Sequence, residues 1–204
     1  RSSDLFDLPA AARHTDATEL LARDDVDAVV VATPPLTHLD LARKTLDAGK
    51  HLMLEKPLAE SLDDGLAIAD AAAKADPVTQ VAFCVRSSQL VDRCRQAIAD
   101  GDIGTPVLGW YHMFLQVKKV AWWRQDPAHR GGKLYDCLCH YYDMLLYIVG
   151  GRYRRVCVFG GPAGEPGPNT DGAAQVASVI IELDTGARLS VNLSEVTPTR
   201  GNCQ

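Results

Sequence analysis

The sequence lacks the features that mark membrane, nucleic-acid-binding and disulfide-stabilised proteins. None of its apolar runs approaches the roughly 18 residues of a membrane-spanning helix. Lysine and arginine are scattered and the formal net charge is −5, so no basic stripe is available to neutralise nucleic-acid phosphates. The six cysteines form no CxxC pair, which argues against a zinc ribbon or a disulfide framework. We therefore expect a soluble cytoplasmic protein with reduced thiols that binds neither nucleic acid nor membrane.

Two further absences concern the start of the chain and its glycines. The sequence begins at Arg1-Ser2-Ser3, without an initiator Met or a signal peptide, which predicts an internal start. A GxGxxG turn, which seats a dinucleotide pyrophosphate on a helix N-terminus, occurs nowhere in the chain. The 204 residues, 47% of them hydrophobic, nevertheless suffice for one large domain or two small ones.

The first part of the chain alternates strand and helix patterns. Short β-rich runs predict strands, and amphipathic or alanine-rich runs between them predict helices, at 27–33, 37–49, 51–54, 61–75 and 78–83 in that alternating order. Such repeats are wired as right-handed parallel βαβ units, so we expect half of a doubly wound sheet. Ligands of such sheets bind at the carboxyl ends of the strands, where Thr33-Pro34-Pro35, Glu55-Lys56-Pro57 and Cys84-Val85-Arg86 fall.

The helix predicted at 61–75 has its own start signal. Ser61 is the expected N-cap, with Asp64 three residues later in a carboxylate variant of the capping box. Apolar side chains recur at helical spacing behind it and predict the face that packs on the sheet: Leu62, Leu66, Ala69 and Ala73.

The pattern of predicted elements changes after residue 86. A helix ending at Gly101 is followed by longer runs with alternating hydrophobicity and a hairpin signal at Asp184-Thr185-Gly186, which predict strands at 106–117, 154–160, 173–183 and 187–196. The fold class is thus α/β, a partial Rossmann domain followed by an α+β domain with a mostly antiparallel open sheet. We place a dinucleotide-binding domain at 1–84 and a substrate-binding and oligomerisation domain at 85–204.

The helix predicted at 131–151 has polar side chains of possible catalytic residue types on one face. At 100° per residue, one face gathers apolar side chains and the opposite face gathers Asp136, His140, Asp143 and Tyr147. The apolar face consists of Leu134, Leu138, Tyr141, Leu145 and Val149. Asp136 and His140 lie one turn apart, within reach of each other.

This polar face has two other interpretations. A solvated face fits poorly, because solvent faces are normally filled with Lys, Glu and Arg. A metal site from Asp136, His140 and Asp143 is chemically possible but is not expected, since Cys137 and Cys139 point to other faces and the other histidines lack ligand spacing.

Lys56 also has two interpretations. A lysine ahead of a helix is usually an exposed charge. Lys56, however, follows a buried strand directly and precedes Pro57, which restricts its backbone, so we favour a positioned amine. Trp122-Trp123-Arg124 could equally be core aromatics or part of a site.

Five segments together resemble the Gfo/Idh/MocA family of NAD(P)-dependent oxidoreductases, the group of glucose–fructose oxidoreductase and inositol dehydrogenase. In order they are DDVDAVVVATPPLTH (24–38), AGKHLMLEKPLA (48–59), IADGDIGTPV (98–107), WWRQDPAHRGG (122–132) and LYDCLCHYYDMLLYIVGG (134–151). The resemblance implies a Rossmann domain and a second α/β domain whose open sheet mediates homo-oligomers, dimers or tetramers.

The resemblance also implies roles for single residues. Lys56 matches the lysine of the EKP motif near the nicotinamide ribose and the reacting oxygen, and Asp136 and His140 match the Asp-x-x-x-His pair, with the histidine as acid/base. Contacts with the cofactor, NAD or NADP, are expected from Thr33, Pro34, His38, Glu55, Lys56 and Arg124. Contacts with the substrate are expected from Trp123, Asp143 and Tyr147.

These matches predict hydride transfer between a nicotinamide and a secondary alcohol or ketone of a sugar, cyclitol or similar polyol. Two rivals stay open: a non-catalytic regulator that binds a dinucleotide or sugar, and a family branch that uses transient hydride transfer for hydrolysis or epimerisation. The missing glycine-rich turn and Lys133, where the family often has glycine, are departures. They suit either an excerpt of a longer polypeptide or a degenerate paralogue, and the intact Lys56, Asp136 and His140 favour the excerpt.

Overall fold

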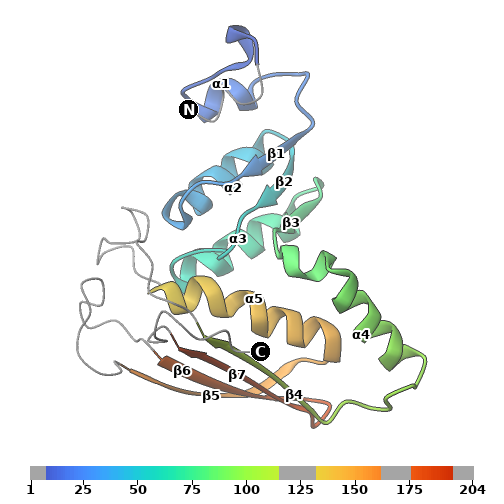
Figure 1. Cartoon of the computed structure of the whole chain (residues 1–204). Coiled ribbons are helices and arrows are strands. Elements are labelled where there is room, and N and C mark those ends of the chain that lie inside the picture. The colour runs from blue at the N-terminus through green and yellow to red at the C-terminus, as the bar shows by residue number, and fades with distance from the viewer. Residues whose placement is uncertain (1–7, 115–131, 162–175, 195–204) are drawn as a thin grey trace. The chain divides into compact units, whose positions relative to one another are not determined.

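A computed structural model describes residues 8–114, 132–161 and 176–194, with the backbone alone for 132–134. The chain divides into two units, Arg1–Ala82 and Phe83–Gln204. Figure 1 shows the chain coloured by residue number from the N-terminus to the C-terminus. Each unit has its own sheet and its own hydrophobic core.

The first unit is a parallel α/β unit, as the sequence predicts. Its sheet has the order β1 (Ala28–Val31), β2 (His51–Leu54), β3 (Thr79–Val81), and both pairings are parallel. The connections between the strands carry η3 (Pro35–Thr37), α2 (His38–Asp47) and α3 (Leu62–Lys74). Short helices η2 (Ala10–Ala12) and α1 (Ala17–Leu21) precede β1. All three strands therefore present their carboxyl ends at one edge.

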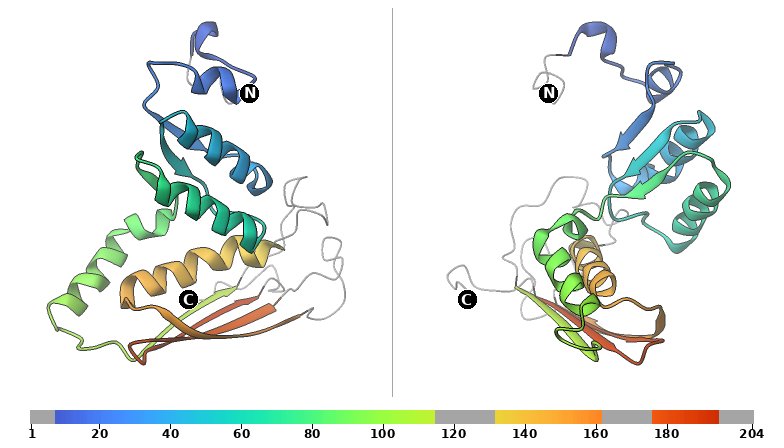
Figure 2. Two further views of the ribbon diagram at one scale, coloured as in Figure 1. Left: turned by 180° about the vertical axis from the view of Figure 1, so that it is seen from behind. Right: turned by 90° about the vertical axis from the view of Figure 1, so that its right-hand side faces the viewer.

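Within the described residues, helices cover only one face of this sheet (Figure 2). Side chains alternate along a strand, so Val31, Leu52 and Leu54 point to the face on which α2 and α3 pack, and all three are buried. On the other face, Val30 is 65% and Met53 39% exposed. Parallel sheets normally have both faces covered, and this arrangement is the expected half of a doubly wound sheet.

The structure confirms the predicted start of α3 and corrects its packing face. The Ser61 hydroxyl accepts a hydrogen bond from the Asp64 backbone N–H at 3.1 Å. The predicted stripe is wrong, because its members are all exposed: Leu62, Leu66, Ala69 and Ala73. The helix instead buries Ile68 and packs Ala71, Ala72 and Ala75, with Gly65 against Leu58 and Ala59. Periodicity alone does not distinguish between the two apolar stripes of this helix. The stripe with the small residues is the packed one, because small side chains let α3 approach its neighbours closely.

A buried histidine holds together the loops at the carboxyl edge of this sheet. His38, the first residue of α2, is fully buried, with Nε2 3.0 Å from the Thr33 carbonyl oxygen and Nδ1 3.2 Å from the Leu58 carbonyl oxygen. A ring that carries one proton donates to one of these oxygens, and a ring that carries two donates to both. His38 therefore links the loop after β1 to the loop after β2.

The second unit packs two helices with a mixed sheet. The helices are α4 (Gln89–Ala99) and α5 (Gly132–Val149), and the single turn η4 (Cys84–Ser87) precedes them. The strands follow the order β4 (Leu108–Phe114), β7 (Arg188–Ser194), β6 (Val176–Leu183), β5 (Tyr153–Gly161). Two of the three pairings are antiparallel, and β4 runs parallel to β7. The predicted hairpin turn joins β6 to β7, where Gly186 has a φ of +86° and its N–H donates to the Leu183 carbonyl.

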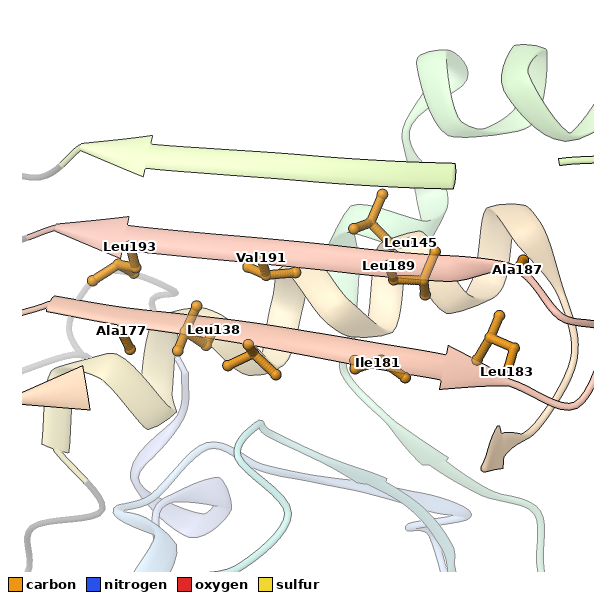
Figure 3. Close-up of a cluster of buried hydrophobic side chains, with 10 residues drawn as sticks. Leu138, Leu145, Ala177, Ile181, Leu183, Ala187, Leu189, Val191 and Leu193 are labelled. Carbon is orange, nitrogen blue, oxygen red and sulfur yellow. The ribbon is translucent and has the colours of Figure 1, made fainter. Parts of the chain in front are cut away.

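The core of this unit lies between α5 and the sheet (Figure 3). Leu138 and Leu145 of α5 meet side chains from one face of β6 and β7, among them Ile181, Leu189 and Val191. Tyr141 and Val149 pack at the margin of the same cluster. The apolar face predicted for this helix is thus confirmed, apart from Leu134, whose side chain lies outside the described residues.

Hydropathy gives no sign of a membrane span in the part of the chain that the structure describes. No helix there combines the length and the apolar character needed to cross a bilayer.

The corrected face of α3 can be tested by a matched pair of truncations. Ile68→Ala should lower the free energy of unfolding by about 2–5 kcal/mol, because it opens a cavity at a side chain that is 2% exposed. Leu66→Ala, at 59% exposure, should change it by less than about 0.5 kcal/mol. Urea denaturation followed by circular dichroism measures both values. Equal losses would contradict the observed face.

The role of His38 can be tested in the same assay. His38→Leu removes a fully buried ring whose nitrogens face the Thr33 and Leu58 carbonyl oxygens, and should cost about 2–4 kcal/mol of unfolding free energy. His51 is a graded control, since it is exposed and its Nδ1 accepts one bond, from the Val78 N–H at 2.9 Å. His51→Leu should cost about 1 kcal/mol or less. A smaller loss at His38 than at His51 would show that His38 does not link the loops.

Candidate active site

Glu55 and Lys56 stand directly after β2, at the carboxyl edge of the first sheet. The Glu55 N–H donates to the Val31 carbonyl at 2.9 Å, which continues the pairing of β2 with β1 by one residue. The Lys56 N–H donates to Glu55 Oε2 at 3.0 Å, and Pro57, joined to Lys56 by a cis peptide bond, is buried. Lys56 itself is half-buried. The backbone N–H of this lysine is therefore held in place, while the positioning of its amine stays a prediction.

The loop after β1 presents Thr33 at the same edge. The Thr37 hydroxyl donates to the Pro34 carbonyl at 2.9 Å, and Thr33 Oγ1 lies 2.6 Å from Thr37 Oγ1. Because a hydroxyl has one proton, Thr33 is the donor in this pair and keeps its lone pairs as acceptors. Thr33 is exposed and Pro34 half-buried. This loop could therefore accept a hydrogen bond from a ligand.

His38 was expected to lie near the cofactor. The structure directs both of its ring nitrogens to backbone carbonyl oxygens and buries the ring completely. Any effect of His38 on a ligand must therefore pass through the backbone of the two loops that it joins.

Asp136 and His140 lie one turn apart on the polar face of α5. Both are half-buried, and the rings of His140 and Phe83 lie nearly perpendicular to each other with their centroids 6.2 Å apart. The alternative of a solvated face is wrong, because Asp143 on the same face is buried. The polar face is instead packed against η4 and α4.

Asp143 forms a two-point ion pair with Arg86 of η4. Arg86 Nε lies 2.8 Å from Oδ2, and Arg86 Nη2 lies 2.5 Å from Oδ1. The carboxylate holds the pKa of Arg86 above its ordinary value, mainly through this hydrogen bonding and against the opposing effect of burial. Such paired bonds fix the relative orientation of both groups.

Tyr147, one turn after Asp143, carries two cations against its ring. The Cζ atoms of Arg86 and Arg95 lie 4.7 Å and 4.0 Å from the ring centroid, within the range of cation–π attraction. Contacts of Asp143 and Tyr147 with substrate hydroxyl groups stay a prediction, since both side chains already have partners in this unit.

The contacts of Phe83, Arg86 and Arg95 were not predicted from the sequence. One signal was present: Arg86 falls just after a strand, and Asp143 has no lysine or arginine one turn away on its own helix, so it needs a cation from another element. Trp123 and Arg124 lie outside the described residues. Lys56 belongs to the first unit and Asp136 and His140 to the second, so their meeting in one cleft stays a prediction.

The described residues contain no group of three or more His, Cys, Asp or Glu side chains that could hold a metal ion. Asp143, one member of the metal site considered above, is bound by Arg86.

The residues at the edge of the first sheet fit part of a nicotinamide dinucleotide. Such cofactors lie across the carboxyl ends of parallel strands, where Thr33 offers an acceptor and Lys56 an amine. The sequence has no GxGxxG turn, so none of its residues is assigned to the pyrophosphate.

Both units match protein-family models. Residues 3–83 match the family model described as an oxidoreductase family with an NAD-binding Rossmann fold. Residues 91–203 match the model of the GFO/IDH/MocA C-terminal domain. The two matches meet close to the division between the two units.

Related proteins extend well beyond this chain. It is 30% identical over 187 residues to scyllo-inositol 2-dehydrogenase (NAD(+)) of Bacillus subtilis (strain 168), covering 90% of this chain and 53% of that protein. An NAD binding oxidoreductase from Klebsiella pneumoniae superposes with a TM-score of 0.81 at 26% identity, over 91% of this chain and 52% of that one. Levoglucosan dehydrogenase in its apo form gives 0.82 at 25% identity, over 93% and 54%.

The chain thus spans about half the length of the relatives that it matches. With one family model on each unit and the same fold in solved relatives, the chain belongs to the Gfo/Idh/MocA oxidoreductase family.

Proposed function

We propose that this chain forms the catalytic part of an NAD(P)-dependent oxidoreductase that acts on a secondary alcohol or ketone of a sugar, cyclitol or similar polyol. The observation that carries the proposal is the alignment of 90% of the chain with a protein named as an inositol dehydrogenase. A nicotinamide cofactor, when bound, supplies the hydride donor or acceptor.

His140 is the proton acceptor for the substrate hydroxyl in the oxidative direction. Its half-buried place beside the Phe83 ring restricts the imidazole, and Asp136, one turn earlier, orients it and tunes its basicity. In the reductive direction the same imidazole returns the proton. The opposite side of α5 is fixed in the core, so the pair rests on a rigid helix.

Lys56 stabilises the negative charge that develops on the substrate oxygen. Its ammonium group suits an alkoxide, and its constrained backbone reduces the reorganisation needed during the reaction. Thr33, Pro34, Glu55 and Arg124 are proposed to contact the cofactor, with His38 acting through the backbone. Trp123, Asp143 and Tyr147 are proposed to contact the substrate.

The outer face of the second sheet is proposed to join copies of this chain into a dimer or tetramer. Large apolar side chains project from β4 and β5 on the side away from α5, and Trp110 and Phe159 are 65% and 64% exposed. Leu108, Phe114 and Ile180 add to the same face. Exposed large apolar side chains gathered on one face of a sheet are typical of an interface with a second copy.

Replacing Lys56 by Met tests the catalytic proposal. In the full-length protein, Lys56→Met should lower kcat/KM for a cyclitol or sugar substrate by about 10³-fold, because removal of one preorganised group at a developing charge costs about 3–4 kcal/mol. Lys74→Met is the matched control, since Lys74 forms an exposed i,i+4 pair with Asp70, and it should leave turnover unchanged.

Absorbance of the reduced nicotinamide measures the rates, with product formation followed in parallel. Survival of Lys56→Met within about tenfold of the parent would contradict the role of the lysine. Ligand binding without turnover in the unaltered protein would favour a regulator. Product without net cofactor reduction would favour transient hydride transfer.

Replacing Trp110 by Asp tests the proposed interface. A charge on this apolar face should reduce the assembly to monomers at micromolar concentration, because an unpaired buried carboxylate costs several kcal/mol. Leu62→Asp is the matched control, since Leu62 is 77% exposed on α3 of the first unit. Light scattering coupled to size exclusion measures the mass. An unchanged mass in Trp110→Asp would remove the face from the interface.

A further inference from the structure

Arg86 reaches the catalytic face of α5 without belonging to the helix. Its guanidinium holds both oxygens of Asp143 at 2.8 Å and 2.5 Å, across 57 positions of sequence. The Asp143 side chain is 12% exposed and that of Arg86 is 43% exposed. A carboxylate this buried needs a partner, and the two-point contact fixes the place of η4 along α5.

The same segment touches His140 through Phe83. The Phe83 ring meets the His140 ring edge-on at 6.2 Å, and Arg86 Cζ lies 5.6 Å from the centroid of Phe83. His140 and Asp143 are three residues apart and so lie on neighbouring turns of one face. Phe83 therefore lies against the imidazole. Arg86, three residues later in the same segment, is held to the helix by its ion pair with Asp143.

Charges of both signs lie around this turn of α5. Asp136 and Asp143 belong to the helix, Arg86 belongs to η4, and Arg95 of α4 lies over the Tyr147 ring. Other titratable groups there are Cys84 of η4, Tyr153 of β5, which interacts electrostatically with Arg86 and Asp143, and Tyr141 of α5 with Tyr111 of β4 stacked on it at 4.1 Å. Burial raises the pKa of Tyr141 above its ordinary value, so this phenol adds no charge.

We propose that Arg86 and Asp143 are positioning residues for His140. The pair holds Phe83 against the imidazole and cancels the charge of Asp143, so that the basicity of His140 is set by Asp136 and by the bound ligands. This inference rests on the proposed function only in giving His140 a catalytic role; the contacts themselves belong to the second unit. It predicts effects on His140 that are visible without substrate or cofactor.

The test is an NMR titration of the His140 imidazole in the full-length protein. The protein is labelled at its histidines, of which this chain has six, and the signal is assigned by its loss in His140→Gln. Arg86→Met leaves the Asp143 carboxylate in excess, favours the imidazolium and should raise the titration midpoint by about half a pH unit. Asp143→Asn leaves the guanidinium in excess and should lower the midpoint by about the same amount.

Two further variants separate charge from geometry. The double variant Arg86→Met with Asp143→Asn should bring the midpoint back to within about 0.2 pH unit of the parent, since neither charge remains. Arg86→Lys keeps the charge and loses the two-point contact, so the midpoint should stay while the ring-current shift from Phe83 weakens. Under the proposed function, Arg86→Lys also lowers kcat about tenfold with little change in KM.

Arg23→Met is the matched control. Arg23 holds Asp25 with the same two-point geometry, at 2.8 Å and 2.6 Å, in the first unit. This variant should leave the His140 midpoint unchanged. If Arg86→Met fails to fold by circular dichroism, the lower midpoint expected for Asp143→Asn and the weaker ring-current shift expected for Arg86→Lys still decide.

An unmoved His140 midpoint in Arg86→Met and Asp143→Asn, or midpoint shifts of the same sign in these two variants, would overturn the inference. The two proposals fail separately. Opposite midpoint shifts together with full turnover in Lys56→Met would remove the catalytic proposal and leave the positioning of His140 intact. Loss of turnover in Lys56→Met without midpoint shifts at His140 would remove the positioning of His140 and leave the catalytic proposal intact.

Discussion

The burial of one face of α5 is the constraint on which the second unit depends. Leu138 and Leu145 fill the space above β6 and β7, so the helix has one rotation about its axis that satisfies the core. That rotation turns Asp136, His140 and Asp143 to the opposite side. The direction of this polar face is thus a consequence of hydrophobic packing, and it requires no interaction among the polar groups themselves.

Once the polar face is turned away from the core, its charge decides what can pack on it. A carboxylate that is mostly removed from water needs a cation with good geometry, and Arg86 supplies one from η4. Arg86 and Arg95 both lie over the ring of Tyr147, so an aromatic side chain accommodates two cations in one place. The polar face is therefore a structural surface as well as a chemical one.

The sequence predicted the strands, the long helices and the apolar face of α5, because each depends on local periodicity and capping. It gave the wrong face for α3, because an alanine-rich helix has more than one apolar stripe. The buried stripe depends on tertiary packing, in which Gly65 lies against Leu58 and Ile68 is buried. The Arg86–Asp143 pair joins residues 57 positions apart, and no local pattern specifies such a partner. His38 was assigned to a ligand contact because its sequence neighbours are shared with the family, whereas its ring is occupied by backbone oxygens.

Each unit buries a polar residue beside a side chain that is proposed to react. In the first, His38 joins the loop that contains Lys56 to the loop after β1, and in the second, Asp143 with Arg86 fastens η4 beside His140. A reactive amine or imidazole must keep its solvation and its pKa in a usable range, which full burial would prevent. The supporting polar residues can be buried because they do not react, and their hydrogen bonds offset the cost of removing them from water. The separation of the two tasks lets the reactive groups stay half-exposed while their geometry is fixed.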